Sequence, residues 1–83
     1  MILVKSRAYD RRGRKCAEIH TMRVADHFVT TVVLTDDFPD GPDVVSFNSW
    51  TASEARTFHL GGARAIAGRD GRVETEVPGL LAP

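Results

Sequence analysis

The stretch "HFVTTVVLT", residues 27–35, is the densest run of β-branched side chains in the chain. Such side chains are stiff about the first side-chain torsion and pack well on a pleated sheet. Both alternating faces of the run are apolar or carry threonine. We therefore predict a central strand here, with neighbouring strands on both sides.

The segments around this strand predict an antiparallel sheet. Residues 1–9 and 16–24 alternate as strands do, and residues 44–48 form a short fourth run. The charged, glycine-containing segment 10–15 is typical of an exposed hairpin turn, and segment 36–43 is a loop by composition. Connections this short favour antiparallel pairing of strands that follow one another in sequence.

A single helix is expected over residues 51–67. Thr51 and Glu54 have the spacing of a capping box, and Gly68 stands where a left-handed C-terminal cap is wanted. Helical spacing groups one set of side chains toward the sheet, namely Ala55, Phe58, His59, Gly62, Ala63 and Ile66.

These elements predict an α+β fold with one domain over residues 1–83. A three- or four-stranded antiparallel sheet (residues 1–48) carries one C-terminal helix on one face. Residues 69–83 form either a short fifth strand or a tail, because "RVETEV" alternates and Pro78 would end it.

Two glycines inside the expected helix need a reason, since each costs about 1 kcal/mol relative to alanine. Gly62 falls on the sheet-facing side, where a missing Cβ would let the helix approach the sheet. We therefore expect alanine at this position to clash. Gly61 lies on a different side and indicates either a bend or the close approach of a second backbone.

The charges are segregated although the net charge is zero. Residues 1–23 carry a balance of +5 and residues 24–55 a balance of −6. Such asymmetry indicates a surface for a charged partner, two hairpins that face each other, or head-to-tail contact between subunits. The candidate partner-binding residues are the basic Arg11, Arg12, Arg14 and Lys15 and the acidic Asp36, Asp37 and Asp40.

No motif in the sequence indicates a metal, a cofactor or a catalytic centre. Cys16 and His20 would lie about 13 Å apart on one strand, too far to share an ion. The aspartates of segment 36–43 lack the ligand order of a calcium loop. No nucleophile elbow frames a serine or Cys16, and the helix glycines do not follow a strand as phosphate-binding loops require. We expect no cofactor, no metal and no enzymatic activity.

Protein binding has two positive indications. Trp50 precedes the helix, and aromatic anchors of this kind are enriched in interaction hot spots. Trp50 could equally be a staple residue packed on the helix. The sheet face without the helix would present Val29, Thr31 and Val33, which we expect to form a homodimer interface; the alternative is a dimer through an edge of the sheet.

We therefore expect a small protein that binds another protein as an accessory factor or inhibitor, with a homodimer as its assembly. The composition is typical of a GC-rich bacterial or bacteriophage source, where inhibitors of host defence systems have this size. The alternative is a nucleic-acid-binding or transcription-linked module that acts through the basic hairpin Arg11–Lys15. No apolar run approaches the roughly 20 residues of a membrane span, and the lone cysteine suits a reducing compartment, so we expect a cytoplasmic protein.

Overall fold

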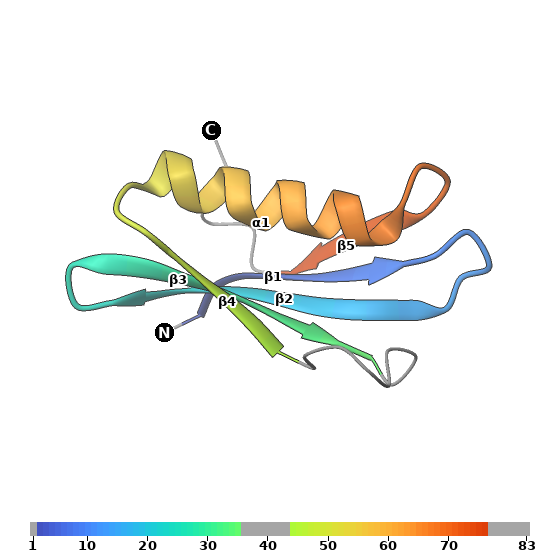
Figure 1. Ribbon diagram of the computed structural model, residues 1–83, viewed down its shortest axis with the longest axis horizontal. Helices are drawn as coiled ribbons and strands as arrows, with labels where there is room; N and C mark the ends of the chain where they lie inside the picture. The colour runs from blue at the N-terminus through green and yellow to red at the C-terminus, as the bar shows by residue number, and fades with distance from the viewer. Residues whose placement is uncertain (1, 36–43, 77–83) are drawn as a thin grey trace.

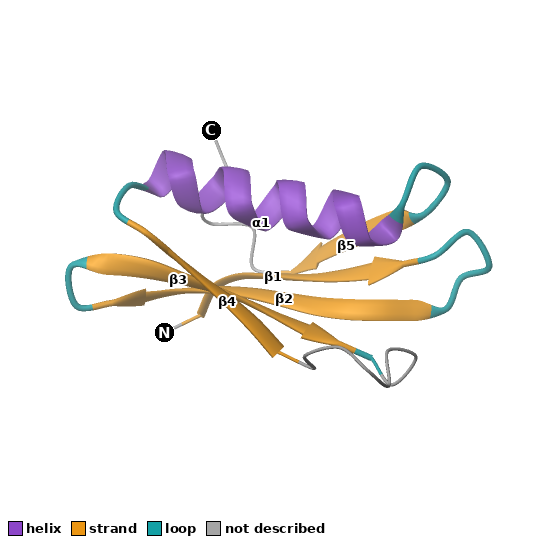
Figure 2. Cartoon of the chain, in the orientation of Figure 1, coloured by secondary structure: helices purple, strands orange, loops and turns teal. Residues whose placement is uncertain are grey.

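The computed structural model describes residues 2–35 and 44–76, which form one antiparallel sheet and one helix (Figures 1 and 2). The chain runs through β1 (Ile2–Tyr9), β2 (Lys15–Val24), β3 (His27–Leu34), β4 (Val44–Ser49), α1 (Ala52–Ala67) and β5 (Arg72–Glu76). The strand order is β4-β3-β2-β1-β5, so the chain leaves one edge of the sheet, crosses its face as α1 and adds a strand at the other edge. The predicted α+β fold is confirmed, and the fifth strand is present.

The core lies between α1 and the face of the sheet that it covers. Strand alternation sends every second side chain of β1 and β2 to this face, where Val4, Ala8 and Ile19 are fully buried. Alanine is the most frequent of the buried hydrophobic residues that the structure describes, and its small side chain lets the helix lie close to the sheet. The main cluster comprises Ala8, Ala17, Ile19, Val32, Ala63 and Ala67.

The N-terminal cap of α1 is the expected one, whereas Gly68 at the C-terminal end has a positive φ with a ψ of 178°, outside the left-handed helical region that was expected. The hydroxyl of Thr51 accepts a hydrogen bond from the Glu54 amide, and Gly68 adopts a φ of 79°. The Glu54 carboxylate accepts hydrogen bonds from the Thr51 hydroxyl and from the backbone amide of Trp50. In a standard capping box the carboxylate accepts from the amide of the N-cap residue, here Thr51, so the amide that is bonded lies one residue earlier.

The face of α1 that packs on the sheet agrees only in part with the predicted one. Ala55, His59, Ala63 and Ala67 are buried, whereas Phe58 is 38% exposed. The expected clash at Gly62 is wrong, because a Cβ built on Gly61 or Gly62 meets nothing within 4 Å. The helix contacts the sheet through its alanines, His59 and Ile66, and a side chain added at either glycine would meet open space.

We therefore predict that Gly61→Ala and Gly62→Ala each raise the free energy of unfolding by about 0.5–1 kcal/mol. Alanine gains helix propensity at both positions and meets no neighbouring atom. Chemical denaturation of the two variants measures the change. A loss of stability in either variant would contradict the open environment.

Within residues 2–35 and 44–76, no helix is long and apolar enough to cross a membrane. Residues 69–71 and β5 take up the first part of the region predicted as a strand or tail, and residues 77–83 lie outside the described ranges.

Candidate functional site

An apolar groove lies between α1 and the β3–β4 side of the sheet. Its volume is about 280 Å³, and every lining atom that contacts it is apolar. Pockets that enclose drug-sized ligands span roughly 300–1,000 Å³, so this open groove suits one or two apolar side chains instead. The lining residues are Val32, Leu34, Val45, Phe47, Gly62, Ala65 and Ile66.

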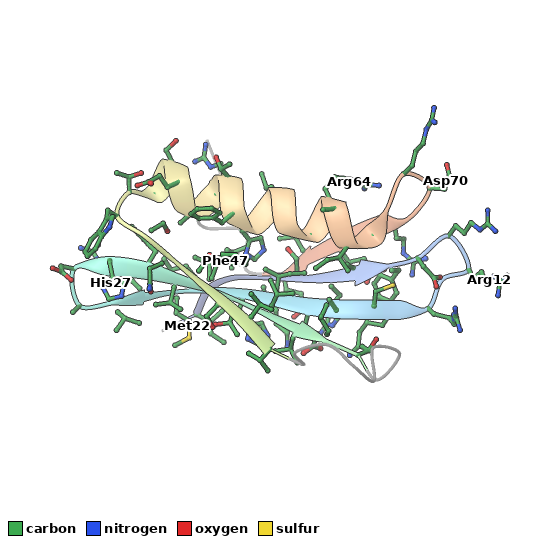
Figure 3. The ribbon with its side chains drawn as sticks, viewed as in Figure 1. Arg12, Met22, His27, Phe47, Arg64 and Asp70 are labelled. Atoms are coloured by element: carbon green, nitrogen blue, oxygen red, sulfur yellow. The ribbon has the colours of Figure 1, made fainter. Side chains whose placement is uncertain are left out.

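Gly62 keeps this groove open, because the missing side chain leaves the space beside Ala65 and Ile66 unfilled. Phe47 lies under the helix (Figure 3) and stacks on Phe58, with ring centroids 5.6 Å apart. Both rings remain about 40% exposed. The groove thus continues into an exposed aromatic pair.

Strand β4 forms the edge of the sheet next to the groove. It pairs only with β3 among the strands that the structure describes. Its sequence, "VVSFNS", carries no charge, and Val44 is 53% exposed. Natural edge strands are usually protected by charges, proline or bulges, and none of these lies within β4. We call β4 together with the groove the β4 surface.

Trp50 lies at the C-terminal end of the β4 surface and is 67% exposed. Its indole contacts the His27 ring, with ring centroids 5.4 Å apart. The partner-binding role predicted for this residue stays a prediction.

A buried polar network joins α1 to the sheet. The Ser6 hydroxyl lies 2.7 Å from His59 Nε2, and the Thr21 hydroxyl lies 2.8 Å from His59 Nδ1. Thr75 and Thr30 extend the chain of hydroxyls at 3.0 and 2.9 Å. Burial, together with the nearby His20, lowers the pKa of His59 to about 4, so the imidazole is neutral near pH 7.

The Ser6–His59 contact has the distance of a nucleophile and its base, and the sequence did not single out Ser6. Both side chains are fully buried, and the second imidazole nitrogen faces Thr21 instead of a carboxylate. A substrate would have to displace α1 to reach the serine. This geometry supports a role in docking the helix.

The sheet face away from α1 divides into two halves. On β1, β2 and β5, Arg7 pairs with Glu18 and Glu76, and Lys15 pairs with Glu18. These contacts lower the pKa of Glu76, chiefly through the hydrogen bond from Arg7, and that of Glu18, chiefly through the one from Lys15.

The other half of this face, on β3 and β4, carries no Asp, Glu, Lys or Arg; it is half-buried along β3 and exposed along β4. It contains the predicted interface residues Val29, Thr31 and Val33, which strand alternation places opposite the buried Thr30 and Val32. The structure brings the three residues onto one face, and their role as an interface stays a prediction.

The basic hairpin is held by Asp10. Its carboxylate accepts hydrogen bonds from the amides of Arg12 and Arg14, and Gly13 adopts a φ of 81°. The hydrogen bond from the Arg14 amide is the main cause that lowers the pKa of Asp10. Arg11 and Arg12 are exposed, and the Arg12 side chain points away from the sheet at the tip of the hairpin (Figure 3).

The loop between α1 and β5 joins the hairpin at the same end of the molecule (Figure 1). Tyr9 and Arg72 are paired residues, and the Arg72 guanidinium lies 4.3 Å over the Tyr9 ring. Arg64 donates to the carbonyl oxygens of Gly68 and Gly71 at 2.7 and 3.0 Å, which fixes the loop. The sequence did not anticipate that this loop would adjoin the basic hairpin.

Across the described residues, no three His, Cys, Asp or Glu side chains gather as a metal site would require. Asp36, Asp37 and Asp40 lie outside the described ranges. The residue before them, Thr35, bonds to the carbonyl oxygens of Lys15 and Cys16.

Comparison of the chain with known protein families, with curated proteins and with solved structures found no match in any of the three.

Proposed function

We propose that this chain is a non-enzymatic protein that binds another protein through the β4 surface. One observation carries the proposal: an apolar groove lies open beside an uncharged edge strand. A partner segment that extends the sheet at β4 would gain backbone hydrogen bonds from the edge and would place alternate side chains over the groove. Trp50 at the end of the strand would supply an aromatic anchor.

A protein of this kind acts by occupying a surface of its partner, as accessory factors and inhibitors do. Assembly as a homodimer belongs to the same proposal. The half-buried Cys16 is the only cysteine, which fits a reducing compartment, and we place the protein in the cytoplasm on this ground.

Selection from a library of displayed extended peptides, with the purified chain as bait, tests the proposal. We expect selected peptides to alternate apolar and polar residues. Gly62→Leu fills the groove and should weaken their binding at least about tenfold, which corresponds to 1.4 kcal/mol. Fluorescence anisotropy with labelled peptides measures the dissociation constants.

Thr57→Leu is the matched control, because it adds a leucine at an exposed position of α1 that does not line the groove. It should leave peptide affinity unchanged. If the chain is monomeric and selects no peptide, or if Gly62→Leu and Thr57→Leu bind the selected peptides equally well, the β4 surface is not the binding site.

A second candidate function, binding to nucleic-acid phosphates, is favoured by the basic end of the molecule. Residues 10–15 carry a net charge of +3 and the adjoining residues 64–72 a net charge of +2. Arg11, Arg12 and Arg69 are all exposed at this end. Two loops with excess positive charge could contact successive phosphates of one strand.

We predict that this function, if present, shows a steep loss of affinity for a single-stranded oligonucleotide as salt rises. The triple change Arg11→Ala, Arg12→Ala and Arg69→Ala should reduce the slope of log affinity against log salt by about 2, since each phosphate contact contributes roughly 0.7. Arg23→Ala, about 26 Å from Lys15 along β2, removes one positive charge outside the basic end and is the control for the single change Arg12→Ala. The absence of binding at low salt would remove this candidate.

A further inference from the structure

We infer that the occupant of the β4 surface is a second copy of this chain, paired β4 to β4 in antiparallel orientation so that two five-stranded sheets become one. The inference rests on the proposed function and names its partner. Such an interface is isologous: the same strand meets itself across a two-fold axis, and the assembly closes as a dimer.

Charge distinguishes the two edges of the sheet. Strand β4 carries no ionisable side chain, so two copies can meet without bringing like charges together. Strand β5, at the other edge, reads "RVETE" and presents Arg72, Glu74 and Glu76. Pairing β5 with itself, or with β4 of a neighbour, would place these charges in the interface, as in natural edges that resist pairing. The uncharged edge is therefore the one that suits a second copy.

The groove provides space for the partner's side chains. In β4, Val45 and Phe47 belong to the helix-side face and Val44 and Ser46 to the opposite face, because side chains alternate along a strand. A second β4 strand would bring its own Val45 and Phe47 to the helix side, next to the hollow that Gly62 leaves. Val45 and Phe47 of each copy would thus line its own groove and also contact the groove of the other copy.

An edge-to-edge dimer also leaves the ion pairs on the sheet face away from α1 exposed to water. Stacking two such faces through Val29, Thr31 and Val33 would bring the Arg7–Glu18 pair and its neighbours toward a dry interface. Taking paired charges out of water costs several kcal/mol per ion before their attraction repays it. Pairing through β4 leaves these groups in solvent.

Size-exclusion chromatography with light scattering tests the inference on the whole chain. We expect a mass of twice the 9.1 kDa chain that falls toward one chain on dilution. Ser46→Lys places a lysine in the middle of β4, where the two-fold axis brings both copies together, and should give a monomer with unchanged circular dichroism. Ser53→Lys makes the same substitution at an exposed position of α1 and should remain dimeric.

Two further variants keep the result decisive. Gly62→Leu, on the helix side of the interface, should weaken the dimer even if Ser46→Lys folds poorly. Val29→Asp, on the open sheet face, should leave it intact. A wild-type chain that stays monomeric at high concentration overturns the inference. A dimer that survives Ser46→Lys and Gly62→Leu but dissociates with Val29→Asp also overturns it, in favour of face-to-face packing.

The outcome separates this inference from the proposed function. A monomer that still selects apolar peptides sensitive to Gly62→Leu retains the β4 surface as a binding site and contradicts only the second copy as its occupant. A monomer that selects no peptide contradicts both.

Discussion

Lowering the pH from 7 to 4 is expected to remove about 3 kcal/mol of folding free energy through His59 alone. Burial lowers the pKa of this histidine from 6.5 in the unfolded chain to about 4 in the folded protein, and each pH unit of difference is worth about 1.4 kcal/mol. Between these values the unfolded state binds more protons, so stability falls as the pH falls. Above pH 6.5 this contribution is complete.

Urea denaturation at a series of pH values measures the effect. In His59→Gln the step between pH 6.5 and 4 should disappear, while the loss at lower pH from Asp10, Glu18 and Glu76, whose pKa values are lowered, remains. His27→Gln, on a partly exposed histidine, is the control and should keep the step. Equal pH profiles for wild type and His59→Gln would show that the imidazole is not buried as described.

The second large effect is expected from Gly71→Ala, which should lower the free energy of unfolding by about 3 kcal/mol. A Cβ at this position would overlap the carbonyl oxygens of Ala67 and Tyr9 and would lie 2.7 Å from the Ala67 carbonyl carbon. All three are backbone atoms that cannot rotate away, so the loop must move. Overpacking in tight structures costs about 1–3 kcal/mol, and a backbone clash stands at the upper end.

Thermal and urea denaturation of Gly71→Ala, beside Gly61→Ala, measure this difference. The two substitutions are chemically identical, and they should act in opposite directions because Gly61 faces open space. Displacement of the loop should also weaken the stacking of Arg72 on Tyr9 and fray β5. If Gly71→Ala unfolds at the same urea concentration as wild type, the tight approach of this loop to β1 is wrong.

The strands and the helix could be predicted because each is encoded locally. The β-branched run of β3 and the Thr51 cap depend on residues a few positions apart, and the structure confirms them. The charges and the glycine of segment 10–15 likewise predict a turn from residues that are adjacent in sequence. Local periodicity therefore suffices for the fold class.

The groove and the buried network depend on contacts between distant residues. Ser6 and His59 are 53 positions apart, and their hydrogen bond requires the register between β1 and α1. Gly62 was assigned to close packing because helical spacing gives its direction without the depth of the space beneath it. Sequence alone cannot distinguish a filled hollow from an open one, so the groove beside β4 could not be predicted, and the binding role of Trp50 stays a prediction.

Hydrogen–deuterium exchange at two protein concentrations tests most directly the claim that β4 is the binding edge. Backbone amides of Val44–Ser49 should exchange more slowly at the higher concentration, because pairing with a second copy gives the outer amides hydrogen-bond partners. Amides of Arg72–Glu76, at the charged edge, should exchange at the same rate at both concentrations. Exchange in β4 that is independent of concentration, with protection appearing instead in β5 or nowhere, would contradict the account.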